Sequence, residues 1–400
     1  MAEWRKRCLG EITSFMAKGI PPKYVESETE DTVRVLNQKC NRNFEINYEE
    51  SRLHDCSKKK VPADKMLQPG DVLINSTGTG TAGRVAQLYD VPTPTTIDGH
   101  MILLRPTEEI DSIYYGYAVK ALQPKIETLA EGSTGQTEIN RKRLQEDIVI
   151  CFPTKKEMQE RIGRFLLNID EKIKMNFKIN KNLEQQMQAL FHSLFVENAN
   201  PTWKDGVLSD LGTIVAGGTP AKSKPEYYSE HGIAWITPKD LSLYKSKFIS
   251  HGELDISELG FSKSSATKMP AGTVLFSSRA PIGYIAIAAN EVTTNQGFKS
   301  VVPNENVGTA FMYYLLKLLL PTIKGMASGS TFKEISGSGM KAVPVVIPDD
   351  ETIKKFNAFC IPIFQQQEIL EAESFRLSNI RDMLLPKLMS GKIDVSDINL

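Results

Sequence analysis

The sequence predicts an α+β fold in which two repeated, mostly-β domains are separated by two long helices. The helices are expected to pair as an antiparallel coiled coil, which would relate the two halves by pseudo-two-fold symmetry. Two observations lead to this prediction. The chain repeats itself with a period of about 200 residues, and each copy ends in a long stretch with coiled-coil periodicity.

The repeat runs through most of the 400 residues. Trp4 returns as Trp203, and Gly19-Ile20-Pro21 returns as Gly218-Thr219-Pro220. The other matching stretches, in chain order, are 9–12 with 211–214, 69–73 with 271–275, 95–99 with 293–297, 114–115 with 313–314, 132–134 with 329–331, 138–139 with 334–335 and 150–153 with 345–348. Because the order is kept throughout, both halves are expected to adopt one fold.

The segments 155–196 and 352–390 are predicted to be the long helices. Apolar and amide side chains recur there in alternating steps of four and three, which is the 3.5-residue period of a coiled coil. We call these positions the seam. In the first helix the seam comprises Ile162, Leu166, Ile169, Ile173, Asn176, Asn180, Leu183, Met187, Leu190 and Leu194. In the second it comprises Phe356, Cys360, Ile363, Gln367, Leu370, Ser374, Leu377, Arg381, Leu384 and Leu388.

The polar seam residues are expected to fix the register of the pair at some cost in stability. Pro362 is expected to kink the second helix or to delay its start. An alternative is that each helix packs only on its own domain. Against it, a helix of about 40 residues is about 60 Å long, more than a domain of about 150 residues can cover.

Short β-type runs separated by glycine, proline and threonine turns fill the segments between the helices. The clearest are 72–74, 101–104, 273–276 and 284–288. The expected organisation is a first domain at 1–153, a spacer helix at 154–198, a second domain at 199–348, a spacer helix at 349–392 and a tail at 393–400.

Composition excludes several classes of protein. No apolar run approaches the length of a membrane span, and no apolar signal-peptide core follows the first residues, so a cytoplasmic protein is expected. The five cysteines form no C-x-x-C pair, which favours thiols in a reducing compartment over a disulfide framework or a zinc site. His54 and Cys56 are too isolated to predict a metal site.

The 48 basic and 48 acidic residues balance, so any affinity for nucleic acid must come from local patches. Candidate patches are 5–7, 58–60, 141–143, Lys222 with Lys224, and Arg279. Taken singly, each of these patches is also typical of an ordinary solvated surface.

Several phrases resemble the target-recognition domains of Type I restriction-modification specificity subunits. These are 235–241 (Trp-Ile-Thr-Pro-Lys-Asp-Leu), 272–283 (Gly-Thr-Val-Leu-Phe-Ser-Ser-Arg-Ala-Pro-Ile-Gly), 329–331 (Gly-Ser-Thr) and the ending at 384–393. The resemblance covers nearly the whole chain. It implies two target-recognition domains, each reading one half of an interrupted, asymmetric DNA sequence. It also implies a helical spacer that sets the gap, and assembly with modification (methyltransferase) and restriction (translocase and nuclease) subunits.

The expected contacts to double-stranded DNA are polar and basic side chains in the repeated loops, which suit phosphates and base edges. They are Lys23, Asn75, Ser76, Thr77, Thr79, Arg84, Thr96, Ser133, Thr134, Gln136 and Arg141 in the first half, and Thr219, Lys222, Lys224, Thr237, Lys239, Ser277, Ser278, Arg279, Asn295, Gln296, Ser330, Thr331 and Lys333 in the second. The first half departs from the family phrase, since 75–80 replaces Ser-Ser-Arg-Ala-Pro. Simple turn chemistry is the alternative reading of these loops.

Rival functions find less support. The stretch 78–83 imitates a dinucleotide-binding fingerprint, but 84–92 reads as a short strand and a turn where a helix is required, so no cofactor is expected. A stand-alone methyltransferase would carry an Asn- or Asp-Pro-Pro-aromatic motif, and a motor would carry a phosphate-binding loop; neither occurs. The acidic pair at 349–350 is explained by a helix start rather than a nuclease site. A scaffold without a DNA role would not need polar loops in both halves.

Overall fold

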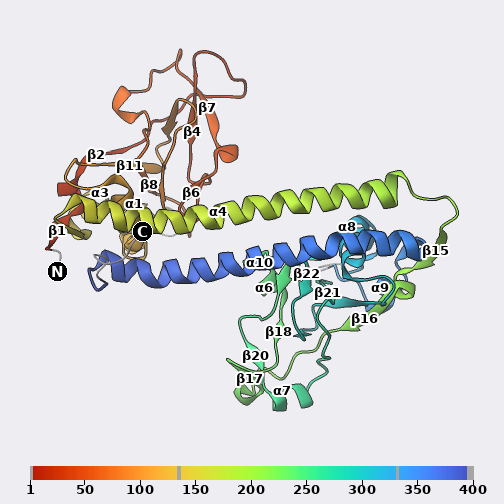
Figure 1. Cartoon of the computed structure of the whole chain (residues 1–400). Helices are drawn as coiled ribbons and strands as arrows, with labels where there is room; N and C mark the ends of the chain where they lie inside the picture. Colours follow the sequence, from red (N-terminus) through yellow and green to blue (C-terminus); the bar gives the residue numbers. More distant parts are fainter. Residues whose placement is uncertain (1–2, 133–136, 330–332, 394–400) are drawn as a thin grey trace. The chain divides into compact units, whose positions relative to one another are not determined.

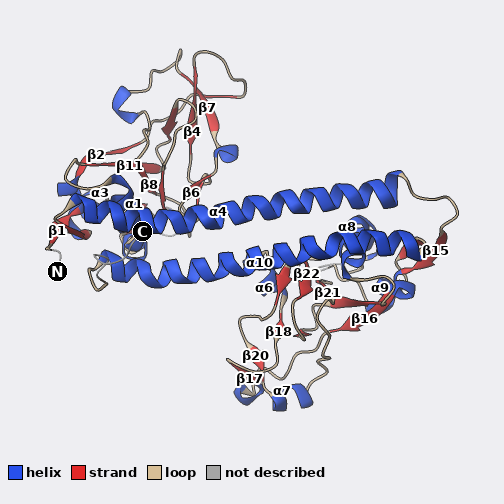
Figure 2. Cartoon of the chain, in the orientation of Figure 1, coloured by secondary structure: helices blue, strands red, loops and turns tan. Residues whose placement is uncertain are grey.

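The computed structural model describes residues 3–132, 137–329 and 333–393, and it divides the chain into two compact units. Unit 1 comprises Met1–Ile173 together with Arg376–Leu400, and unit 2 comprises Lys174–Phe375. Figure 1 labels the elements of both units, and Figure 2 distinguishes helices from strands. The division passes through two long helices, so each unit contains a segment of both.

Unit 1 is a mostly-β domain with two four-stranded sheets, of order β2-β11-β8-β9 and β10-β4-β7-β3. A two-stranded pair, β1 with β14, joins its first and last strands. Its strands and helices are β1 (Trp4–Cys8), β2 (Thr13–Lys18), β3 (Tyr24–Val25), β4 (Thr32–Leu36), β5 (Asn41–Arg42), β6 (Glu45–Ile46), β7 (Arg52–Asp55), β8 (Val72–Asn75), β9 (Val85–Gln87), β10 (Thr95–Ile97), β11 (Met101–Pro106), α1 (Ser112–Ala121), α2 (Gln123–Glu127), β12 (Ala130–Glu131), β13 (Glu138–Ile139), α3 (Arg141–Asp147) and β14 (Val149–Pro153).

Unit 2 contains a five-stranded sheet of order β16-β24-β21-β22-β19 and a terminal pair, β15 with β25. Its elements are β15 (Lys204–Val207), α5 (Leu208–Leu211), β16 (Gly212–Ala216), β17 (Tyr228–Ser229), β18 (Trp235–Ile236), α6 (Pro238–Tyr244), β19 (Phe248–Ile249), β20 (Asp255–Ile256), α7 (Glu258–Ser262), β21 (Val274–Phe276), β22 (Ile285–Ala288), β23 (Thr293–Thr294), β24 (Lys299–Pro303), α8 (Thr309–Met326), α9 (Gly337–Lys341) and β25 (Pro344–Ile347).

The two units repeat one topology, as the internal sequence repeat predicted. The order β2-β11-β8-β9 corresponds strand for strand to β16-β24-β21-β22. The parallel pair β4 and β10 corresponds to the parallel pair β18 and β23. All four β-type runs recognised in the sequence fall on strands of these sheets, namely β8, β11, β21 and β22. The mixed helix and strand architecture is therefore confirmed.

The two long helices are α4 (Lys156–His192), which continues into a π-helical turn at Ser193–Glu197, and α10 (Asp350–Met389). In unit 2 their seam residues meet in antiparallel order. Asn176 Nδ2 donates to Ser374 Oγ at 3.2 Å, and Asn180 Nδ2 donates to the backbone carbonyl of Gln367 at 3.4 Å. Met187 Sδ lies 3.6 Å from Cys360 Sγ. All twenty seam residues are buried or half-buried, so the 3.5-residue pattern identified the inward faces of the helices.

The expectation that Pro362 delays the second helix is wrong. The helix α10 begins at Asp350 and continues through Pro362. The carboxylate of Asp349 caps its start by accepting from the Thr352 amide at 2.8 Å, which confirms the helix-start reading of 349–350. Buried side chains on both sides of the proline, Phe356, Cys360 and Phe364, explain why the helix continues: their packing offsets the single lost backbone hydrogen bond.

In unit 2 a buried ionic cluster fastens the β domain to both long helices. Lys247, whose side chain is 6% exposed, forms an ion pair with Glu184 of α4 and donates to Gln367 Oε1 of α10 at 2.7 Å. Lys317 of α8 binds the same Glu184 carboxylate at 2.5 Å. Burial raises the pKa of Glu184, but the two lysines outweigh it and hold the pKa below its usual value. The carboxylate is therefore charged in the folded protein.

Unit 1 has a counterpart of this cluster on the same helix. Tyr117 and Lys120 of α1 both reach Asp170 of α4, at 2.6 and 3.5 Å, and Arg381 of α10 binds Asp170 at 2.5 Å. Tyr314 and Lys317 of α8 have the same Tyr-x-x-Lys spacing and share Glu184. Each β domain is thus attached to α4 by a tyrosine and a lysine one helical turn apart, on α1 in unit 1 and on α8 in unit 2.

We predict that Lys247→Met lowers the free energy of unfolding of the chain by about 3 kcal/mol, because Glu184 loses a buried partner. The matched control is Lys268→Met, which removes an ion pair to Glu291 whose side chain is 59% exposed and which should cost less than about 1 kcal/mol. Urea denaturation followed by circular dichroism measures both. Equal losses for the two variants would contradict an anchoring role for the cluster.

Candidate nucleic-acid interface

Five loops of unit 2 surround a cleft of about 750 Å³. The loops precede β17, join β18 to α6, join β19 to β20, join β21 to β22, and follow β23. The cleft is lined by Thr219, Lys222, Pro225, Tyr228, Trp235, Thr237, Pro238, Lys239, Asp240, Glu253, Leu254, Arg279, Ala280, Asn295, Gln296 and Gly297. Seven of these residues were predicted from the sequence as DNA contacts, which makes the cleft the candidate interface.

The buried carboxylate of Asp240 organises one wall of the cleft. It accepts from the backbone amide and the hydroxyl of Thr237, both at 2.7 Å, and so caps the start of α6. Its other oxygen accepts from the Glu253 amide at 2.9 Å. The sequence Thr-Pro-Lys-Asp therefore serves to fix a loop, and it leaves the neighbouring Lys239 exposed beside the cleft.

Amide and hydroxyl side chains line another part of the cleft. Thr219 donates to the side-chain oxygen of Gln296, and Asn295 Oδ1 accepts from the Gly297 amide at 2.8 Å. The Gln296 side chain is exposed. Amide groups of this kind can bond in two places to the major-groove edge of adenine, so these residues are suited to reading bases.

Acidic side chains accompany the basic ones at the cleft. Lys239 is paired with Glu253. Arg279 Nη1 lies 3.5 Å from Glu334 Oε2, and Lys299 Nζ lies 3.6 Å from Glu334 Oε1. Arg279 is half-buried.

Five predicted contacts are corrected by the structure. Their side chains are fully buried and make no surface that DNA could reach: Asn75, Ser76, Thr96, Ser277 and Ser278. Ser277 Oγ bonds to the Pro281 carbonyl at 2.8 Å, and Ser278 Oγ bonds to the Gly297 carbonyl at 3.1 Å. Asn75 Nδ2 donates to the Gln38 carbonyl and Thr96 Oγ1 to the Lys65 carbonyl. These four side chains stabilise the loops from inside, whereas the buried Ser76 hydroxyl makes no hydrogen bond with the residues that the structure describes.

Unit 1 presents the equivalent loops with different chemistry. Thr77 holds the place that Arg279 holds in unit 2, because each forms an isolated bridge to the glutamate of the Glu-Ile phrase, Glu138 or Glu334. Thr77 Oγ1 lies 2.9 Å from His100 Nδ1. His100 is exposed and was missed by the sequence reasoning, although it directly follows the repeated phrase at 95–99.

The remaining predicted residues lie as follows. Lys23, Thr79 and Arg141 are exposed, and Arg84 is half-buried with its guanidinium bonded to the Gly80 carbonyl at 3.0 Å. Lys222, Lys224 and Lys333 are exposed, and Lys224 Nζ lies 3.7 Å from Glu226. Ser133, Thr134, Gln136, Ser330 and Thr331 lie outside the described residues, as does all but the first residue of the tail at 393–400.

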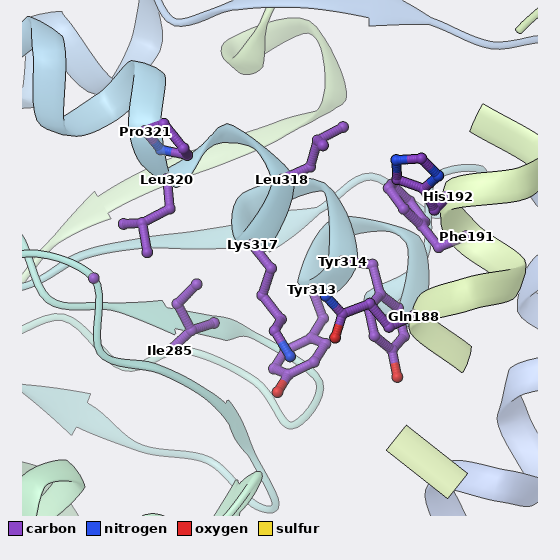
Figure 3. Close-up of a pocket in the computed structure, with 11 residues that line it drawn as sticks. Gln188, Phe191, His192, Ile285, Tyr313, Tyr314, Lys317, Leu318, Leu320 and Pro321 are labelled. Carbon is purple, nitrogen blue, oxygen red and sulfur yellow. The ribbon is translucent and has the colours of Figure 1, made fainter. Parts of the chain in front are cut away.

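A second cavity, of about 430 Å³, lies in unit 2 between α8 and the end of α4. Figure 3 shows Leu318, Leu320 and Pro321 on one side of it, and Phe191 and His192 on the other. Its one ammonium group, that of Lys317, is occupied by Glu184. Because its ammonium group is already paired with Glu184, the cavity is a poor match for a phosphate backbone, and we do not assign it to the interface.

Comparison with known proteins places this geometry in a family. The family model of the Type I restriction modification DNA specificity domain matches residues 1–185 and 200–372. The chain belongs to this family. The two matched segments correspond to the two repeats, so the family resemblance drawn from the sequence phrases is confirmed.

Individual relatives agree. The chain is 39% identical over 185 residues to the MjaIX specificity subunit of Methanocaldococcus jannaschii, a match that covers 44% of this chain and 42% of that relative. It is 24% identical to the HindI specificity subunit of Haemophilus influenzae, covering 98% of this chain and 100% of the relative. The crystal structure of a Type I S subunit from M. genitalium shares the fold, with a TM-score of 0.63, 20% identity and coverage of 97% and 96%.

Membership of this family confirms that the chain is a Type I specificity subunit, the non-catalytic, DNA-recognising part of a multi-subunit restriction and methylation enzyme. The rival expectation of a stand-alone methyltransferase or nuclease is set aside on the same ground. Within the part of the chain that the structure describes, no helix is long and apolar enough to cross a bilayer.

We predict that Arg279→Ala changes recognition of only one half of the DNA target. If the guanidinium reads a guanine edge, discrimination at one base pair should fall by about 1–3 kcal/mol. If it binds phosphate, affinity should fall for all sequences and the salt slope should decrease by about one unit. Fluorescence anisotropy with single-substitution duplexes distinguishes the two outcomes. Lys268→Ala, away from the cleft, is the control, and unchanged binding by Arg279→Ala would show that Arg279 is structural.

Proposed function

We propose that this specificity subunit reads a bipartite, asymmetric DNA sequence, with one half-site bound by each β domain. The observation that carries the proposal is the cleft of unit 2, whose loops between β21 and β22 and after β23 have equivalents in unit 1 with other side chains. One fold with two sets of exposed residues is what two different half-sites require. The contacts that we propose are the exposed and half-buried residues described above, with His100 added.

We further propose that the recognition domains are 1–153 and 199–348, and that 154–198 and 349–392 are the spacer that sets the distance between half-sites. The support is the continuity of α4 and α10 through the division between the units. The segment 393–400 is proposed to be a tail.

The proposed partners are modification (methyltransferase) and restriction (translocase and nuclease) subunits. The helices carry large apolar side chains that are 40–68% exposed: Met175, Phe177, Ile179, Phe359, Ile361, Ile369, Ile380 and Met383. Phe177 is 68% exposed. Because exposed apolar side chains in this number mark interaction surfaces, the helices are the proposed docking site. Such a complex acts on chromosomal DNA, so we propose that it works in the cytoplasm.

We predict that the purified chain transfers no methyl group to DNA by itself and confers sequence-specific methylation when a methyltransferase subunit of its own system is added. Sequencing of methylated bases measures this. The control is the partner without the chain, which should methylate no defined site. Methyl transfer by the chain alone would contradict its role as a subunit without catalysis.

We predict that lengthening the spacer lengthens the gap. One heptad inserted in α4 beside Asn180 and one in α10 at the facing Gln367 keep the seam in phase and add about 10 Å, or about three base pairs of DNA rise. Three base pairs also rotate the second half-site by about 100°, which the protein must accommodate by bending the DNA. The methylated site should keep both half-sites with a gap longer by about one to three base pairs, or methylation should be lost.

The control for the spacer experiment is a heptad placed in the surface loop at 198–202, which leaves both helices unchanged. Full activity of the helix variant at the original gap would show that the helices do not set the distance. Changed bases within a half-site would show that they contribute to the reading surface.

A further inference from the structure

One glutamate occupies the same position in both recognition domains. In unit 1 the Ile139 amide donates to the Ser76 carbonyl at 2.8 Å, and in unit 2 the Ile335 amide donates to the Ser278 carbonyl at 3.1 Å. These bonds place Glu138 and Glu334, the preceding residues, beside Thr77 and Arg279 at the candidate interface. The position is therefore defined by backbone register and not by sequence similarity alone.

In both domains this glutamate forms ion pairs with basic side chains close to the candidate interface. Glu138 pairs with Lys18 on β2. Glu334 bridges Arg279 and Lys299, which approach its two oxygens separately. The basic partners lie at different positions in the two domains, but in each domain the glutamate at this position forms an ion pair with them. Because the carboxylate is common to both domains and its partners are not, the carboxylate is the feature that needs an explanation.

The two glutamates are more exposed than Asp240, which caps α6, and than Glu184, which binds the buried Lys247. Their side chains are 47% and 36% exposed, so water reaches both carboxylates and the pairs with Lys18 and Arg279. Lys299, the second partner of Glu334, is more buried, with 12% of its side chain exposed. An exposed ion pair contributes little to folding. Burial and the nearby Arg141 lower the pKa of Lys18, so a second positive group lies close to the Lys18–Glu138 pair. These carboxylates consequently sit where a DNA phosphate would otherwise be attracted.

Resting on the proposed DNA-reading function, we propose that Glu138 and Glu334 are specificity-determining residues that suppress binding to non-target DNA. Without DNA they hold the basic side chains of each domain and repel phosphates. A target duplex supplies base contacts that offset the loss of these ion pairs, whereas a non-target duplex supplies only the phosphate term. The two glutamates would therefore raise the ratio of target to non-target affinity. This ratio decides how well a protein finds its site among many non-target sequences.

The test uses Glu138→Gln and Glu334→Gln in the complex with the methyltransferase partner. Binding to target and non-target duplexes is measured by fluorescence anisotropy over a range of salt concentrations. Each variant should bind non-target DNA about two- to fivefold more tightly. The salt slope for that DNA should steepen by about one unit for each released cation. Target binding should change less, so the specificity ratio falls.

Two controls complete the experiment. Glu291→Gln removes an exposed ion pair with Lys268 in the same unit but away from the cleft, and it should leave both affinities unchanged. Glu334→Asp keeps the charge and should retain most of the discrimination. The two glutamates lie in different domains, so a folding defect in one variant leaves the other as the test.

Other outcomes overturn the inference. Loss of discrimination at a single base pair, with non-target binding unchanged, would make the glutamate a base-reading residue that accepts from cytosine. Unchanged binding to both duplexes, or weaker binding to both with a lower unfolding temperature, would leave only a structural role. If the wild-type complex showed no sequence preference at all, the proposed function itself would fail, which is a separate result.

Discussion

The antiparallel seam between α4 and α10 is the constraint on which the rest of the protein depends. Each unit draws one wall of its core from these helices, because Ile162 and Leu388 belong to the core of unit 1, and Met187 and Phe356 belong to the core of unit 2. The carboxylates of Asp170 and Glu184 project from the same helix, α4, and receive the tyrosine and lysine of α1 and α8. Each β domain is therefore attached to the long helices by apolar packing and by ion pairs. The ion pairs fix how α1 and α8 are oriented on α4.

The recognition loops follow a different physical rule. Buried polar side chains such as Ser277 and Ser278 bond to the backbone of their own or a neighbouring loop, and the outer side chains remain available. A loop braced from within can hold its outer groups in defined positions, which lowers the entropy lost when DNA binds. The loops can therefore differ between the domains in outer residues such as Thr77 and Arg279 while the backbone keeps one register.

The periodic parts of the structure could be predicted from the sequence. The seam and the strands carry patterns set by burial along a helix or a sheet, and these patterns are local.

The interface was only partly predictable, because the sequence does not show whether a serine in a loop points inward or outward. Ser277 and Arg279 are two residues apart, and only the folded loop distinguishes them. His100 and Glu334 were overlooked since their importance arises from neighbours distant in sequence, as does the burial of Lys247 between Glu184 and Gln367. Pro362 misled because its local effect is outweighed by tertiary packing.

The division of the chain between the units bears on how the protein is made. Unit 2 is built from one continuous stretch, Lys174–Phe375, whereas unit 1 needs Arg376–Leu400 in addition to Met1–Ile173. During synthesis the first domain leaves the ribosome long before Leu385, Leu388 and Met389, which complete its core. Until then Ile162 and Leu166 lack their partners on α10. The domain that is synthesised first is thus the last to be completed, and its apolar helix face is open to chaperones or to premature association throughout the synthesis of the second.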